Sequence, residues 1–437
     1  MASATPKLDH HWLPFTPNRD FHDEPKLFSR AEGVHYYTPD GRAVLDGCSG
    51  LFTSPIGHGR KDIAEAVYKQ LLELDFVSSF QRSHPKAFEA AERVANLTPE
   101  GIDKVFFCNS GSEAVDTAMK IAMAYHRARG QSSRTMFVSR ERAYHGVGFG
   151  GVALSGLVNN RRTFGPGLPN AVHMRHTHGA ERFVMGEPET GADLAEDLLR
   201  IVNLHGAENI AACFVEPIAG STGMLVPPKG YLKRLREICS ANGILLVFDE
   251  VITGFGRTGK AFASQSFGVK PDIITMAKAI TNGVQPMSAV AVDNSVYKTI
   301  VEDSPNPRAA NEFFHGYTWS AHPAACAAAI ATIDIYEKER LFERASQMSA
   351  YFLEGLISLK DIPIVTDIRG YGMAGGIDVA PTQVPGERGH VLQKKLYDNG
   401  LHIKTTGDTG ILAPPFVMTT DHIDQMIEIS RKTLTAM

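Results

Sequence analysis

The sequence predicts an α/β protein with a large domain on a mostly parallel sheet and a smaller α+β domain formed by both chain ends. Three observations predict it: continuous apolar runs in mid-chain, helical patterns between them, and a different pattern at each end. Strand, helix and strand in succession indicate a parallel sheet with helices on both faces. At 437 residues, a chain usually divides into more than one domain.

Five apolar runs are predicted to be the strands of the large domain. They are continuous rather than alternating, as in strands that are buried on both faces. Between them, Ser112–Arg129 and Tyr231–Asn242 have helical patterns, and Asn242-Gly243 is typical of a helix end. The runs are Val105–Cys108, Thr135–Ser139, Ile210–Glu216, Ile244–Asp249 and Ile273–Met276.

The two chain ends differ from the middle. The first 55 residues carry the turn signal Thr38-Pro39-Asp40-Gly41 between short strand-like segments. From residue 320 onward a long helix begins near Pro323, followed by strands around Ile364–Ile368 and Gly375–Val379. We therefore predict that residues 1–55 and 320–437 form the small domain and residues 56–319 the large one.

Composition excludes several classes of protein. The chain has 44 Lys+Arg and 48 Asp+Glu, which gives no electrostatic case for binding nucleic acid. No apolar run approaches the ~20 residues that span a membrane, and the N-terminal residues do not resemble a secretory signal. The five cysteines are scattered without a CxxC motif, so we expect neither disulfides nor a metal site, and a cytoplasmic location.

Small and hydroxylated residues follow the first strand of the large domain. Ser110, Gly111 and Ser112 open the next helix, where backbone N–H groups and the helix N-terminus favour an anion. This segment is a candidate phosphate cup. A plain serine N-cap is the alternative interpretation of the same residues.

Charged residues follow two of the later strands. Asp249 ends the strand 244–249, and such an acid is costly to bury unless it meets a cation or a donor. It could hold a protonated ring nitrogen or simply cap a helix. Lys278 follows the strand 273–276 between two alanines; desolvation or Schiff-base formation would make its amine useful in catalysis, whereas a surface lysine would extend into solvent.

Two further motifs bear on a cofactor. Tyr144, in Tyr144-His145-Gly146, could stack on a flat ring. Gly254-Phe255-Gly256-Arg257-Thr258-Gly259 fits the GxGxxG pattern of dinucleotide-binding proteins, but no convincing helix follows it. The candidate features together describe a pyridoxal 5′-phosphate site. In chain order they are a phosphate cup, a stacking aromatic, an Asp at a strand end and a partly buried Lys.

With these residues identified, the chain resembles the fold-type I, class III aminotransferases, and among them the omega-amino acid:pyruvate (β-alanine:pyruvate) enzymes. The resemblance covers nearly the whole chain. The segments that carry it are HHWLPFTPNRDF, SGSEA, YHG, VEPIAGSTGMLVPPKGYL, LLVFDEVITGFGRTG, PDIITMAKAITNG and HGYTWSAHP.

The resemblance implies roles for matching residues. Lys278 is similar to the Schiff-base lysine and Asp249 to the partner of the pyridine nitrogen, while Tyr144 and Ile252 would cover the two ring faces. Thr318 matches a threonine that reaches the phosphate from the neighbouring subunit, which implies a homodimer with shared sites. The remaining cofactor residues would be Ser110, Gly111, Ser112 and Glu216, and for Glu216 a structural role is equally open.

Substrate residues are also implied by the resemblance. Trp12, Phe15, Phe52 and Phe80 are candidates for an aromatic pocket, and Phe52 occupies a position where relatives often have Trp. Lys404 stands where relatives carry an arginine that binds the substrate carboxylate. A lysine offers a point charge instead of a two-pronged fork, so we expect carboxylate substrates still to bind, but less tightly or in a less fixed orientation.

The expected activity is a two-stage transfer of an amino group from an omega-amino acid or another primary amine to pyruvate, with pyridoxal 5′-phosphate as cofactor. A decarboxylase, aminomutase or epimerase of the same fold would use the same lysine and aspartate. A nicotinamide-dependent oxidoreductase is the alternative from another class. The sequence does not identify the preferred amine or distinguish a dimer from a tetramer.

Overall fold

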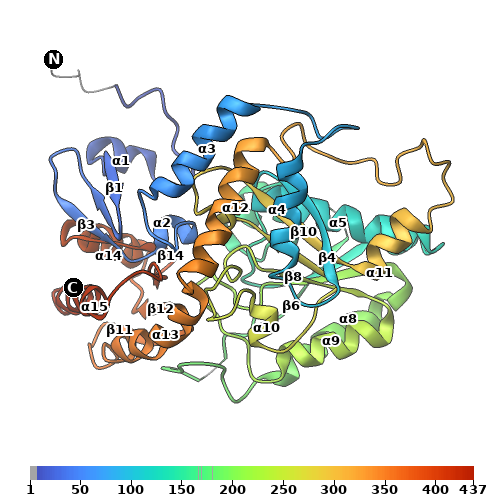
Figure 1. Ribbon diagram of the computed structural model, residues 1–437. Coiled ribbons are helices and arrows are strands. Elements are labelled where there is room, and N and C mark those ends of the chain that lie inside the picture. Colours follow the sequence, from blue (N-terminus) through green and yellow to red (C-terminus); the bar gives the residue numbers. More distant parts are fainter. Residues whose placement is uncertain (1–6, 166, 169, 180) are drawn as a thin grey trace.

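A seven-stranded sheet forms the centre of the molecule in a computed structural model, which describes residues 7–165, 167–168, 170–179 and 181–437 (Figure 1). Strands β6, β5, β7, β8 and β9 run parallel, whereas β10 is antiparallel to both of its neighbours. The mostly parallel sheet is therefore confirmed. The strand order is β4 (Ile102–Cys108), β10 (Ser288–Asp293), β9 (Ile273–Met276), β8 (Leu245–Asp249), β7 (Ile210–Val215), β5 (Met136–Arg140) and β6 (Ala171–Met174).

The five predicted strands are all present. Strands β7, β8 and β9 are buried along their whole length, as the continuous apolar runs predict. Strand β4 starts three residues earlier than predicted. The charged residues Asp103 and Lys104 interrupt its apolar pattern, so the sequence pattern did not include its first residues. Since β4 lies at the edge of the sheet, these polar side chains can remain at the surface.

Helices cover both faces of this sheet. Helix α5 (Gly111–Ala128) shares one apolar cluster with Phe137, Phe214 and Val247. Helices α8 (Glu196–His205) and α9 (Tyr231–Asn242) share a second cluster with the strand residues that point the other way, among them Val138, Cys213 and Leu246. Neighbouring strand residues thus enter opposite clusters, which explains why the runs show no polar alternation.

The glycine pattern at residues 254–259 lies in turns. The next helix, α10 (Ala263–Ser266), has only four residues. A dinucleotide-binding fingerprint instead leads directly from a strand into a long helix. The dinucleotide interpretation of this motif is therefore wrong.

Both chain ends meet in a four-stranded sheet. Strands β1 (Arg30–Glu32), β2 (His35–Tyr37) and β3 (Ala43–Asp46) are antiparallel, and β13 (Leu401–His402) pairs in parallel with β3. The predicted turn at residues 38–41 joins β2 to β3, with Gly41 at φ +88°. A third sheet contains β11 (Val365–Tyr371), β12 (Ala374–Val379), β15 (Thr409–Leu412) and β14 (Lys404–Thr406). The exact domain boundaries stay a prediction.

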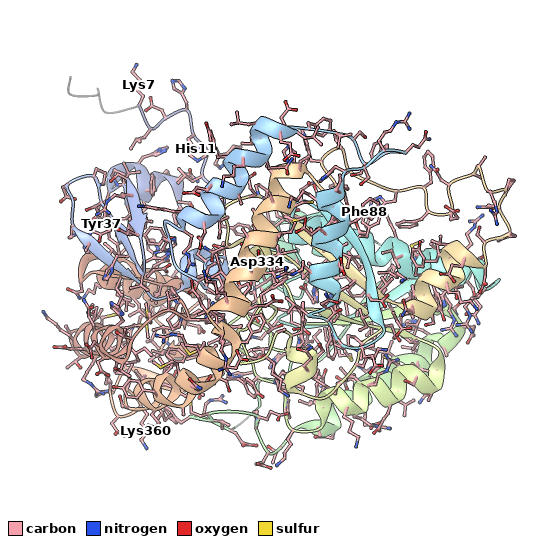
Figure 2. The ribbon with its side chains drawn as sticks, in the orientation of Figure 1. Lys7, His11, Tyr37, Phe88, Asp334 and Lys360 are labelled. Atoms are coloured by element: carbon pink, nitrogen blue, oxygen red, sulfur yellow. The ribbon has the colours of Figure 1, made fainter. Side chains whose placement is uncertain are left out.

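The Ala-rich helix α12 (Pro323–Lys338) packs inside the protein beside α3 (Lys61–Glu73) and α4 (Pro85–Ala95) (Figure 1). Its residue Asp334, labelled in Figure 2, forms an ion pair with Arg93 of α4. Within the described ranges, no helix combines the length and the apolar character that a membrane span requires. The other helices are α1 (Asn18–Asp23), α2 (Ser49–Phe52), α3 (Lys61–Glu73), α4 (Pro85–Ala95), α6 (Phe149–Leu154), α7 (Val158–Phe164), α11 (Asn294–Tyr297), α13 (Leu341–Ile357), α14 (Glu387–Asp398) and α15 (Thr420–Thr435).

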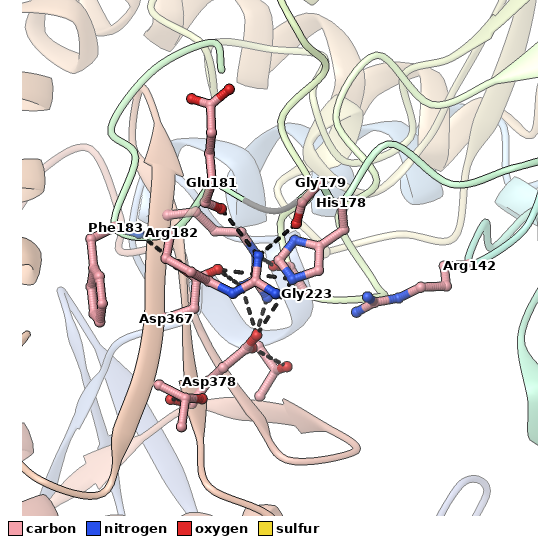
Figure 3. A network of polar contacts seen from close by, with 12 residues as sticks. Arg142, His178, Gly179, Glu181, Arg182, Phe183, Gly223, Asp367 and Asp378 are labelled. Atoms are coloured by element: carbon pink, nitrogen blue, oxygen red, sulfur yellow. Dashed lines mark hydrogen bonds and ion pairs between the residues drawn. The ribbon is translucent and has the colours of Figure 1, made fainter. Parts of the chain in front are cut away.

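A buried polar network joins the third sheet to the loops that follow β6 and β7 (Figure 3). The Arg369 guanidinium donates to Asp367 and Asp378, at 2.7 and 2.8 Å, and to the carbonyl of Gly223 at 2.7 Å. Asp367 also accepts the Phe183 N–H at 2.7 Å. Arg369 thereby ties β11 and β12 to the loop after β7.

The same network brings His178 to 3.9 Å from both carboxylates. These three side chains could offer ligands to a metal ion. However, Arg369 already supplies the positive charge between Asp367 and Asp378. Burial, together with the charges of Arg369 and Arg142, lowers the pKa of His178 to about 4. His178 is therefore neutral near pH 7, and Arg369 is the cation that pairs with both carboxylates.

Candidate active site

A cavity of about 190 Å³ lies at the carboxyl ends of the central strands, beside the N-terminus of α5. This is where open α/β sheets bind ligands. Its lining joins segments that are far apart in the sequence. The lining residues are Gly111, Ser112, Tyr144, His145, Gly146, Glu216, Asp249, Val251, Ile252, Ala277 and Lys278.

The N-terminus of α5 forms one wall of the cavity. The first backbone N–H groups of a helix have no partner within the helix, and Gly111 and Ser112 both line the cavity. The Ser110 hydroxyl instead accepts the N–H of Glu113 at 3.2 Å, which is the N-cap role considered as the alternative. The Ser112 hydroxyl accepts the Val147 N–H at 3.0 Å. Both serines therefore also shape the backbone of this wall.

Gly146 permits a close approach between two walls. It has φ +97°, and a Cβ atom there would lie 2.5 Å from the Ser112 hydroxyl. Any other residue would push the loop that carries Tyr144 away from α5. This glycine therefore holds the Tyr144 loop and the α5 N-terminus at a fixed spacing.

Asp249 ends β8 and is 5% exposed. Its Oδ2 lies 2.8 Å from Nδ1 of the buried His145, and its Oδ1 accepts from the Thr275 hydroxyl and the Val251 N–H, each at 3.2 Å. An ionised carboxylate can only accept hydrogen bonds, so His145 Nδ1 carries the proton. These contacts fix the orientation of Asp249 at the cavity wall.

Lys278 follows β9 in a strained backbone conformation, with φ +53°. Its side chain lines the cavity, and Nζ lies 5.8 Å from the centre of the Phe52 ring. Burial lowers the pKa of Lys278 to about 8, although the charges of Asp249 and Glu216 act in the opposite direction. A lysine with this pKa is partly neutral near pH 7, so its amine can act as a nucleophile or a base.

Glu216 lies just beyond the end of β7 and is 4% exposed. It accepts the N–H of Tyr144 at 2.9 Å and the N–H of Gly220 at 3.0 Å. Burial raises the pKa of this carboxyl group, and the nearby Asp249 adds to the effect. Glu216 thus joins two loops at the cavity, and this structural role was one of the two predicted alternatives.

Tyr144 and Ile252 both line the cavity. The Tyr144 ring is half-buried, and Phe15 packs edge-on against it with 6.5 Å between ring centres. Ile252 packs on Gly220, where a Cβ atom would lie 2.8 Å from Ile252 Cδ1. Both residues lie at the cavity expected for a flat ligand.

The four aromatic substrate candidates occupy different positions. Phe52 is buried near Lys278, and Phe15 contacts Tyr144 while remaining 77% exposed. Phe80 lies next to Gly316, because a Cβ atom at Gly316 would be 2.8 Å from its ring. Trp12 is 90% exposed on the N-terminal segment. Phe52 and Phe15 thus lie beside two residues that line the cavity, Lys278 and Tyr144 respectively.

Lys404, on β14, is half-buried. Its Nζ contacts the Thr405 carbonyl at 3.4 Å, and no carboxylate forms an ion pair with it among the described residues. Burial lowers the pKa of Lys404. Its charge also contributes to lowering the pKa of Lys278, so the two amines are close enough to interact.

Thr318 is exposed and does not line this cavity. Its loop is anchored to α5: the His315 ring contacts the Thr117 hydroxyl at 2.9 Å, and Tyr317 donates to the Glu113 carbonyl at 3.3 Å. The helix that opens with the cavity wall therefore also supports the loop that presents Thr318 at the surface.

His145 is the main site residue that sequence reasoning did not predict. It was noted only as the neighbour of Tyr144, yet it contacts Asp249 and lines the cavity. The signal available was its place in the Tyr144-His145-Gly146 motif. Its partner is 104 residues away in the sequence, so only the fold identifies the pair.

Comparisons with known proteins agree with this geometry. A family model described as Aminotransferase class-III matches residues 18–434. The chain is 50% identical over 430 residues to an omega-aminotransferase of Caulobacter vibrioides, covering 98% of this chain and 97% of that protein. It is 46% identical over 429 residues to an omega-amino acid–pyruvate aminotransferase of Pseudomonas putida, covering 97% and 94%.

Solved structures give the same result. The omega transaminase from Pseudomonas jessenii, in a crystal structure in complex with PMP, matches this fold with a TM-score of 0.92 and 32% identity. The match covers 98% of this chain and 96% of that one. The similarity therefore extends over the small and large sheets alike.

Proposed function

The chain belongs to the class III aminotransferase family, and on that premise we propose that it moves an amino group from an omega-amino acid or another primary amine to pyruvate. The products are alanine and an aldehyde or ketone. The names of the relatives from C. vibrioides and P. putida support this reaction. They do not favour a decarboxylase, an aminomutase or an oxidoreductase. A cytoplasmic location remains a prediction.

The proposed cofactor is pyridoxal 5′-phosphate, which alternates with its amine form, PMP. When bound, it supplies an aldehyde that accepts the amino group and a ring that withdraws electrons from the reacting carbon. The donor set of the cavity fits this group: an amine at Lys278, an acid at Asp249, and free N–H groups at the α5 N-terminus for a phosphate. Gly146 packs closely against Ser112, which leaves a narrow space at the α5 N-terminus, as a phosphate cup requires.

Lys278 has two roles in this proposal. Its neutral amine would hold the cofactor through the aldehyde in the resting enzyme. With a substrate amine bound there instead, Nζ would be free to take a proton from the substrate carbon next to nitrogen and to give it back, as base and then acid. Its lowered pKa, about 8, suits both steps near neutral pH.

Asp249 would keep the ring nitrogen protonated, and His145 fixes the orientation of this carboxylate. Tyr144 and Ile252, which both line the cavity, would contact the ring, and Glu216 supports the Tyr144 loop. The phosphate contacts would come from Gly111 and Ser112, with Ser110 shaping the cup as the N-cap.

Lys404 and Phe52 are the proposed substrate residues that act on Lys278, through charge and through ring contact respectively. Lys404 carries a positive charge without an acidic partner among the described residues, which suits a substrate carboxylate. The Phe52 ring limits the space beside Nζ. Phe15, Phe80 and Trp12 would complete the pocket from more exposed positions.

We also propose a homodimer with shared sites. Thr318 is exposed and firmly supported by α5, as expected for a residue that reaches the phosphate in a second copy of the chain. Sedimentation would give the mass of the assembly. In a dimer, Thr318→Ala should weaken cofactor binding, whereas a monomer of full activity contradicts the shared site.

One observation carries the proposal: Lys278 and Asp249 line the same cavity, and His145 fixes the orientation of Asp249. The test is to incubate the purified protein with pyridoxal 5′-phosphate, β-alanine and pyruvate, and to measure alanine. Lys278→Ala should abolish alanine formation. Loss of β-alanine without an equal gain of alanine would indicate one of the alternative reactions.

A further inference from the structure

A short segment near the cavity, residues 48–52, has an unusual backbone. Ser49, Gly50 and Phe52 have φ values of 47°, 67° and 61°. Glycine adopts this left-handed conformation readily, but serine and especially phenylalanine do so only when their surroundings enforce it. Something in the fold must therefore hold this segment, which we call the Phe52 segment.

Asp46, at the end of β3, is fully buried and lies directly before it. Its Oδ1 accepts the Cys48 N–H at 3.0 Å, and its Oδ2 accepts the Gly50 N–H at 2.6 Å. Oδ2 also lies 2.7 Å from Nε2 of His58. The two carboxylate oxygens thus hold the backbone on both sides of the strained Ser49.

The segment places Phe52 next to the catalytic centre. Phe52 is 2% exposed, and its ring centre lies 5.8 Å from Lys278 Nζ. It belongs to the same apolar cluster as Ile252. Arg257 supports the segment from a second side, donating to the Ser49 hydroxyl at 3.0 Å. The position of the Phe52 ring therefore depends on how the segment is held.

We infer that Asp46 is a positioning residue that sets the size selectivity of the enzyme by holding Phe52 beside Lys278. This inference rests on the proposed function. In Asp46→Asn, one of the two carboxylate oxygens becomes an NH2 group, which cannot accept a hydrogen bond, so the bond from either the Cys48 or the Gly50 N–H is lost. The segment then relaxes, the ring moves away from Nζ, and a substituent on the reacting carbon of the substrate gains room.

A double-mutant cycle tests this, using β-alanine and 3-aminobutanoate, which differ by one methyl group on the reacting carbon. The measured quantity is the ratio of kcat/KM for 3-aminobutanoate to that for β-alanine, because a methyl group is worth about tenfold or more in a shaped pocket. Asp46→Asn and Phe52→Ala should each raise this ratio about tenfold. In the Phe52→Ala background, Asp46→Asn should add less than about twofold, because both act through the same ring.

Asp197→Asn is the matched control, because Asp197 is also a buried carboxylate that accepts a backbone N–H, from Arg175 at 2.9 Å, and it does not line the cavity. It should leave the ratio unchanged. A ratio that is unchanged in Asp46→Asn, or that rises equally with and without Phe52, overturns the inference. If Asp46→Asn does not fold, His58→Gln takes its place, because His58 contacts Asp46. This variant should also raise the ratio, and an unchanged ratio would overturn the inference.

Hydrogen exchange gives a readout that does not depend on activity. The Cys48 and Gly50 amides should exchange faster in Asp46→Asn than in the wild type, and Asp197→Asn should leave them protected. Unchanged protection of these amides overturns the inference even if the wild type makes no alanine. Absence of alanine formation in the wild type would instead refute the proposed function.

Discussion

The His145 imidazole and the Asp249 carboxylate form a buried pair, with 2.8 Å between Nδ1 and Oδ2. The other ring nitrogen of His145 contacts the Ser139 hydroxyl at 3.1 Å. The pair joins the loop after β5 to the end of β8 across the floor of the cavity. It fixes which way the carboxylate points.

The first prediction concerns this pair. His145→Leu removes the donor, and we expect kcat to fall by about 10- to 100-fold, the value of one hydrogen bond to a buried charge. His145→Asn is the matched control, because its amide N–H can take the place of Nδ1–H and should recover most of the rate. Steady-state kinetics on protein of equal cofactor content would check this, and equal kcat values for the His145→Leu variant and the wild type would contradict it.

The second prediction uses the lowered pKa of Lys278, about 8, which burial causes. Only the neutral amine attacks an aldehyde, so the rate of cofactor binding to the cofactor-free protein should rise about tenfold per pH unit below pH 8 and level off above it. Stopped-flow absorption would measure this rate. A rate that keeps rising toward pH ~10.4, the value of a free lysine, would show that the amine is not desolvated.

The third prediction concerns Lys404. Lys404→Ala should raise KM for β-alanine and pyruvate by about 10- to 100-fold, because each loses a charged hydrogen bond. Single-turnover reaction with butylamine, which has no carboxylate, should be unaffected. Lys404→Arg, as control, should bind both carboxylates at least as tightly as the wild type. Unchanged β-alanine and pyruvate kinetics in Lys404→Ala would refute this role.

The fourth prediction concerns stability. Arg369→Met leaves the buried Asp367 and the half-buried Asp378 without their cation, and the free energy of unfolding should fall by about 3–5 kcal/mol. Arg234 pairs with Glu196 at the surface, so Arg234→Met should cost about 1 kcal/mol or less. Urea denaturation would compare the two variants. Similar small losses in both would mean that the buried network adds no stability.

The sequence predicted the parts of the fold and site that local patterns determine. Continuous apolar runs indicated β7, β8 and β9, and therefore Asp249 and the region of Lys278 at their carboxyl ends. Ser110 capping α5 was also readable, because a serine before an apolar helical pattern is a local signal. These features depend on residues close together in the chain.

What the sequence could not predict depends on pairs that are distant in the chain. His145 and Asp249 are 104 residues apart, and no spacing rule joins them. The role of Asp46 could not be predicted from the sequence, because it follows from the backbone angles of Ser49 and Phe52. Ser110 accepts from Glu113 as an N-cap; its contact with a phosphate stays a prediction, because capping and anion binding use the same residue types.

The central claim is that Lys278 bonds covalently to the cofactor. Borohydride reduces such a carbon–nitrogen double bond and makes the attachment permanent, so the labelled residue can be found by mass spectrometry of a protease digest. Reduction of the wild type loaded with pyridoxal 5′-phosphate should place the cofactor mass on the peptide that contains Lys278 and on no other. A label on a different lysine, or none at all, would contradict the account.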